Sequence, residues 1–88
     1  MKIREGFVLR KLPEMNLVMP TGKNVKDFNA ALVLNDTGAL IFELLQKGET
    51  PEAAAHALTI EYDVTEARAL ADVRNTIADL IEAGVAEA

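Results

Sequence analysis

A strand that runs directly into a helix is the feature that most constrains the fold of this chain. Residues 28–34 end in the apolar run Ala31-Leu32-Val33-Leu34, which is too short for a helix and rich in strand-forming residues. Asn35 or Asp36 can cap the helix that follows. We therefore predict a strand over 28–34 and a helix from about 37 to 46, which Lys47-Gly48 closes. The apolar positions of that helix are Leu40, Ile41, Leu44 and Leu45.

Two further strands precede this unit. Residues 7–12 read as one strand, and Pro13-Glu14 supplies a turn, because proline presets the first central position of a turn. Residues 15–19 alternate between two sets, which is typical of a half-buried strand. Three strands joined by short turns predict an antiparallel meander. The alternating sets are Met15, Leu17 and Met19 against Asn16 and Val18, and, in the third strand, Phe28, Ala30, Leu32 and Leu34 against Asn29, Ala31 and Val33.

The remainder of the chain has the pattern of two more helices. Thr50 is expected to cap one of them, with Pro51 at its first position. Thr65 is expected to cap the other, which runs to about residue 83 and ends at Gly84. The order βββααα predicts an α+β fold of winged-helix-like appearance, in one domain spanning residues 1–88. Ala54, Leu58 and Tyr62 are expected to face inward.

The charges are unevenly placed, and this argues against nucleic-acid binding. The chain has a net charge of −5; residues 1–34 hold six basic and three acidic residues, whereas residues 35–88 hold three basic and eleven acidic ones. General binding to phosphates needs a concentrated positive surface. The chain has no cysteine, no apolar run near the roughly 20 residues of a membrane helix, and no apolar segment of signal-peptide type at its start. These features predict a cytoplasmic protein.

No set of residues converges on catalysis or metal binding. His56 is the only histidine, and its helical position, two residues from inward Leu58, predicts a solvated side chain. The chain also lacks serine, and we therefore expect no catalytic residue. The acidic segment around Glu61 does not match a calcium loop, because its sixth and twelfth positions are Glu66 and Asp72 rather than glycine and glutamate. We expect no cofactor and no metal.

The last helix and the third strand together suggest a place for an extended peptide. An apolar stripe on this helix is predicted to face the core, and a face of small residues lies beside it. Alanine is also simply the best helix former, so this face alone decides little. The third strand, however, has no charged residue between Asp27 and Asp36, and an apolar edge next to such a helix can accept a peptide as an added strand. The stripe is Leu70, Val73, Ile77, Leu80 and Ile81, and the small face is Ala67, Ala71 and Ala78, with Arg74 among them and Asn75 at its edge.

The string as a whole resembles the PqqD-like family, also called the RiPP recognition element. The resemblance rests on four stretches spread over nearly all of the chain: the opening GFVLR (6–10), the junction LNDTG (34–38), the apolar helix 39–45, and EYDV (61–64) before the long last helix. Members of this family bind the leader segment of a ribosomally made precursor peptide and present it to a modifying enzyme, often a radical-SAM maturase. Where many relatives carry tryptophan in the helix after the junction, this chain has Phe42.

The resemblance implies that a leader peptide binds between the third strand and the last helix, in pyrroloquinoline quinone synthesis or another RiPP pathway. Two alternatives remain from the sequence: a winged-helix DNA-binding regulator, and a weak homodimer paired through the third-strand edges. Of the two arginines on the last helix, we expect Arg74 to contact the leader and Arg68 to contribute less, because Asp72 offers Arg68 a local partner. The expected peptide-binding residues are Asn29, Ala31, Val33, Ala67, Arg68, Ala71, Arg74, Asn75 and Ala78.

Overall fold

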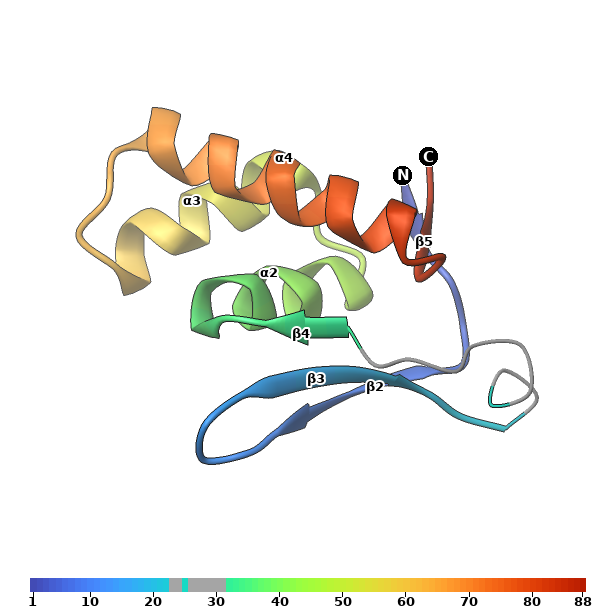
Figure 1. Cartoon of the computed structure of the whole chain (residues 1–88). Helices are drawn as coiled ribbons and strands as arrows, with labels where there is room; N and C mark the ends of the chain where they lie inside the picture. Colours follow the sequence, from blue (N-terminus) through green and yellow to red (C-terminus); the bar gives the residue numbers. More distant parts are fainter. Residues whose placement is uncertain (23–24, 26–31) are drawn as a thin grey trace.

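The computed structural model describes residues 1–22, 25 and 32–88. Within these residues an antiparallel sheet is followed by three helices that lie on one of its faces (Figure 1), which confirms the predicted α+β order; winged-helix-like describes it only loosely. The residues predicted for the first half of the third strand, 28–31, lie outside the described part. The elements are β1 (Lys2–Ile3), β2 (Phe7–Lys11), β3 (Asn16–Pro20), β4 (Leu32–Leu34), α2 (Asp36–Gln46), α3 (Pro51–Glu61), α4 (Glu66–Glu82) and β5 (Ala86–Glu87).

The main sheet has the strand order β2-β3-β4, and both pairs are antiparallel. The turn at Pro13-Glu14 joins β2 to β3 as predicted, and the Leu12 amide donates to the Met15 carbonyl at 2.8 Å to close it. In the second pair Val18 lies opposite Leu32, and Asn16 lies opposite Leu34. The strand order makes β4 one of the two edge strands of the described sheet.

The buried side of β3 is the one that carries a polar residue. Asn16 and Val18 are buried against the helices, whereas Met15, Leu17 and Met19 lie on the outer face of the sheet or at its turn, and are half-buried or exposed. An asparagine can occupy this position because its amide is satisfied: Nδ2 lies 3.1 Å from the Leu34 carbonyl. Hydrophobicity alone would have assigned the two faces of this strand the other way round.

Side-chain caps begin all three described helices. The Asn35 side chain accepts a hydrogen bond from the Gly38 amide, the Thr50 side chain from the Ala53 amide, and the Thr65 side chain from the Arg68 amide. These caps confirm the helix starts predicted from the sequence.

The core lies between the inner face of the sheet and the helices. Phe42 and Ile41 of α2 are fully buried, as is Leu58 of α3. Tyr62 was predicted to face inward as well, but it is 37% exposed. Tyr62 is the C-cap of α3: its amide still donates to the Leu58 carbonyl, but its own backbone is extended (φ −126°, ψ 154°), so its side chain does not continue the inward face of the helix.

The buried face of α4 is rotated relative to the predicted stripe. Val73 and Leu80 are fully buried as expected, but Ala69 is buried too, and Ile81 is 37% exposed. Small residues line the helix pair, since Ala54 and Ala55 of α3 are also buried, and small side chains let two helices lie close together. The large apolar residues used for the prediction therefore do not mark the line of closest packing. Leu70 and Ile77 are only half-buried, and Thr76 is buried.

A second, two-stranded sheet joins the two ends of the chain, and the sequence had not indicated it. Lys2 lies opposite Glu87 and Ile3 opposite Ala86, in antiparallel register. The Arg4 amide extends the contact by donating to the Val85 carbonyl at 2.9 Å. The two ends consequently lie side by side (Figure 1). None of the helices in the described chain is both long and apolar enough to cross a membrane.

Candidate functional site: an open strand edge beside the last helix

The open edge of β4 presents the backbone of Val33. In the β2–β3 pair, the Leu12 amide bonds to Met15 and the Thr21 amide to Gly6, so the odd-numbered residues of β3 direct their backbone groups toward β2. Residues 16 and 18 therefore bond to β4, at Leu34 and Leu32. By the same alternation the N–H and C=O of Val33 point away from β3, toward the open edge.

The junction between β4 and α2 is held by Asn16 and Asn35. Asn16 Nδ2 donates to the Leu34 carbonyl and, at 3.0 Å, to Asp36 Oδ1, which ties both ends of the junction to β3. Asn35 Oδ1 accepts from the Gly38 amide at 2.7 Å. Gly38 itself is buried, and a Cβ there would lie 3.2 Å from Asn35 Oδ1 and 3.4 Å from the Leu34 side chain. The strand edge is thus fixed in place next to the first turn of α2.

A groove of about 380 Å³ lies along this edge. Its walls are β4 and α4, and the start of α2 lies between them. Within the described residues, a strand added to the edge of β4 would lie in this groove, so that the backbone of Val33 and the side chains of α4 could both contact it. The lining residues are Val33, Leu34, Asn35, Thr37, Gly38, Arg68, Asp72, Asn75, Thr76 and Asp79.

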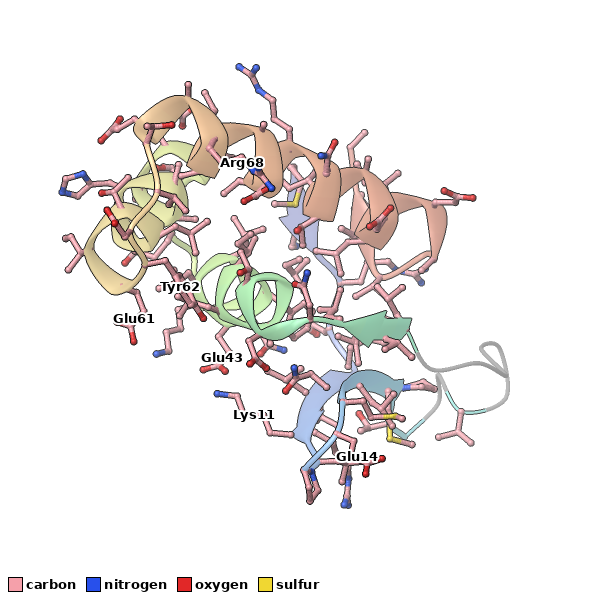
Figure 2. All side chains as sticks on the ribbon, turned by 60° about the vertical axis from the view of Figure 1, so that its left-hand side comes forward. Lys11, Glu14, Glu43, Glu61, Tyr62 and Arg68 are labelled. Carbon is pink, nitrogen blue, oxygen red and sulfur yellow. The ribbon has the colours of Figure 1, made fainter. Side chains whose placement is uncertain are left out.

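The α4 wall of the groove is polar and carries charges of both signs. Arg68 Nε donates to Asp72 Oδ1 at 3.3 Å, an i,i+4 pair that leaves the Arg68 side chain 72% exposed (Figure 2). Asp79 lies further along the same wall, and no described residue forms an ion pair with it. Asn75 adds an amide between them. The wall therefore offers hydrogen bonds and charge rather than an apolar surface.

The opposite edge of the sheet is covered by side chains of α2. Gln46 Nε2 donates to the outward-facing carbonyl of Phe7 at 3.0 Å. Lys11 Nζ lies 2.6 Å from Glu43 Oε1, and Figure 2 shows the two side chains pointing toward each other. The Glu43 carboxylate accepts a hydrogen bond from the ammonium and attracts its charge, which raises the pKa of Lys11. Charged side chains on an edge strand oppose the addition of another strand, so β4 is the more receptive of the two edges.

The structure brings three of the predicted site residues to the groove: Val33, Arg68 and Asn75. Val33 does so with its backbone, because its side chain pairs across the sheet with Leu17 on the outer face and is 61% exposed. Asn29 and Ala31 lie outside the described residues. The other predicted residues, Ala67, Ala71, Arg74 and Ala78, are exposed on α4 and do not line the groove.

Arg74, which was expected to contact the leader, does not line this groove. Taking 100° per residue, Arg74 lies about 140° around α4 from the middle of the groove-facing residues. The prediction took the alanine face of α4 to be the side that faces the groove. It also gave Arg68 less weight, because Asp72 could pair with it. Asp72, Thr76 and Asp79, together with Thr37 and Gly38, were missed. One signal in the sequence could have indicated the α4 wall of the groove: polar residues recur at 68, 72, 75 and 79, a spacing that places them on one face of a helix.

The described residues do not match the pattern of a metal centre. No group of three histidine, aspartate or glutamate side chains there could hold an ion. His56 is exposed on α3, as predicted, with Nδ1 3.2 Å from Glu66 Oε1 on the neighbouring helix. This pair lies on the surface and does not line the groove.

The open edge and the groove define a small sheet-and-helix domain built to hold an extended chain, and comparison with known proteins identifies its family. Residues 15–86 match the family model described as coenzyme PQQ synthesis protein D (PqqD). The chain belongs to this family.

Two solved structures share the fold over almost their whole length. One, described as lasso peptide synthetase B1 complexed with the leader peptide, is 28% identical, with a TM-score of 0.78 over 99% of this chain and 96% of the other. The second, TbiB1 in complex with the TbiA(beta) leader peptide, is 23% identical, with a TM-score of 0.78 over 99% and 95%. No curated protein matches the sequence.

Proposed function

We propose that this protein binds the leader segment of a ribosomally made precursor peptide and presents it to the enzyme that modifies the peptide. The observation that carries the proposal is the outward N–H and C=O of Val33 at the end of the sheet, beside a groove walled by α4. Family membership and the two similar proteins solved with leader peptides support it. The leader joins the sheet as an added strand, so its backbone supplies affinity and its side chains supply specificity.

The chain acts without chemistry of its own, as a single domain in the cytoplasm. Binding the leader raises the local concentration of the precursor at its enzyme, which is a radical-SAM maturase if the protein works as the sequence resemblance implies. The pathway is pyrroloquinoline quinone synthesis or another pathway of ribosomally made peptides. The family description supports the first and the lasso-peptide structures support the second.

The regulator and homodimer alternatives have less in their favour. A DNA-binding α4 would present Asp72 and Asp79 on its groove side and Glu66 and Glu82 elsewhere, and all four repel phosphate. Self-pairing of β4 edges would compete with the leader for the backbone of Val33, so it would appear as weak, peptide-reversible association.

The test is a displayed library of leader segments from PQQ and lasso-peptide precursors, with a scrambled copy of each, followed by amide hydrogen exchange on the bound complexes. We expect natural leaders to be enriched and to slow exchange at Val33. The Leu9 amide is the internal control, because it faces outward at the covered edge of β2 and should be unaffected. Equal enrichment of scrambled leaders, or protection at Leu9 in place of Val33, would refute the proposal.

A further inference from the structure

The groove carries an arginine that is paired with Asp72 toward one end, and toward the other an aspartate that pairs with no described residue. Arg68 and Asp79 both line it, eleven positions apart on α4. A rise of 1.5 Å per residue separates them by roughly 16 Å along the helix. At about 3.3 Å per residue, an extended peptide covers that distance in about five residues. One bound strand is therefore long enough to meet both charges.

Both charged groups have bonding capacity left for a ligand. An arginine has five N–H donors, and the contact with Asp72 uses only Nε. Asp79 forms no ion pair with any residue in the described ranges. The groove thus offers unused N–H donors of Arg68 toward one end and, toward the other, a carboxylate with which no described residue pairs.

The direction of the added strand then sets the order of charges in the ligand. Figure 1 shows β4 running in the opposite direction to α4, so the Leu34 end of β4 lies toward Arg68 and the Leu32 end toward Asp79. Every strand pair in the described sheet is antiparallel, and an antiparallel ligand would run from the Leu34 end to the Leu32 end. Such a ligand passes Arg68 before it passes Asp79.

The following inference rests on the proposed function. We propose that the leader carries an acidic residue opposite Arg68 and, four or six residues later, a basic residue opposite Asp79. The spacing is even because alternate side chains of a strand share a face, and both residues must point toward α4. Charge complementarity of this kind selects both the ligand and its direction in the groove.

The test selects a displayed library of random 14-residue peptides on wild type, on the double variant Arg68→Glu/Asp79→Lys, and on the control Arg74→Glu/Glu82→Lys. The control makes the same charge changes on exposed positions of the same helix that do not line the groove. We expect acidic-then-basic peptides from wild type and from the control, and basic-then-acidic peptides from the groove variant. Each selected peptide should prefer its own protein by about fivefold or more, since an exposed ion pair contributes up to about 1 kcal/mol.

Amide exchange at Val33 separates the two proposals. Peptides that protect Val33 from exchange but show the same charge order with all three proteins would overturn the charge inference and leave leader binding standing. Peptides that bind without protecting Val33 would overturn both. Urea unfolding of each variant checks that the charge reversals leave the fold intact.

Discussion

Removing one backbone N–H at the strand edge should weaken leader binding while changing the stability of the fold much less. An amide-to-ester substitution at Val33, made by chemical synthesis, removes that N–H and keeps the side chain. Because the Val33 amide points away from β3, stability in urea should fall only by the weakening of the bond that the Leu32 carbonyl, now part of an ester, accepts from β3. A net hydrogen bond contributes about 0.5–1.5 kcal/mol, so leader affinity measured by calorimetry should fall about two- to tenfold.

The matched control is the same substitution at Leu34. Its amide is directed toward β3, where Asn16 lies opposite, and removing it leaves the carbonyl of a buried residue without its partner. The free energy of unfolding should then fall by about 1–3 kcal/mol. Equal destabilisation by the two esters would show that the alternation of hydrogen bonds assigned to β4 is wrong. An unchanged leader affinity in the Val33 ester would rule out strand addition at this edge.

Three further predictions concern the stability of the fold. Phe42→Ala should cost about 3–5 kcal/mol in urea unfolding, because Phe42 is fully buried; a loss below 1 kcal/mol would contradict its place in the core. Asn16→Ala should cost about 1–3 kcal/mol, since it removes both hydrogen bonds that Asn16 makes to the β4–α2 junction. It should also weaken leader binding more than Thr59→Ala, a surface control. The pKa of Lys11 is higher in the folded state than in the unfolded state. Its pairing with Glu43 therefore stabilises the fold at pH values below the unfolded-state pKa, and this stabilisation is lost as the pH rises through the folded-state pKa. The stability difference between wild type and Glu43→Gln should therefore shrink above pH 10.5, whereas a constant difference would exclude this pair as its source.

Sequence patterns predicted the elements of this fold better than they predicted its faces. The helix starts followed from capping residues such as Asn35 and Thr65, because a cap is a local interaction with a fixed spacing. The faces of β3 and α4 depend on neighbours distant in sequence: Asn16 is buried because the Leu34 carbonyl and Asp36 are there to accept from it. No pattern within β3 contains that information.

The candidate site shows the same division. The open edge at Val33 was predicted from an uncharged stretch of strand, and the order of strands in the described sheet agrees. The helix wall was predicted from alanine content, whereas the groove beside β4 is lined on α4 by polar residues. A rotation of α4 by a fraction of a turn decides whether Arg74 or Arg68 lies at the groove, and the packing of α4 against α3, α2 and β5 sets that rotation.

The two-stranded sheet of β1 and β5, a short β-ribbon, has a consequence for the order in which the chain folds. Its partners, such as Lys2 and Glu87, are 85 positions apart in the sequence, and closing a flexible loop of that length costs on the order of 4 kcal/mol. Two residue pairs cannot offset this cost alone, so the ribbon forms only after the helices have brought Val85 next to the start of the chain. On the ribosome, residues 2–4 must wait until residues 85–87 have emerged. In the folded protein, Val85 and Ala86 belong to the same buried core as Leu34, so the late pairing of β1 with β5 completes the core that also supports β4.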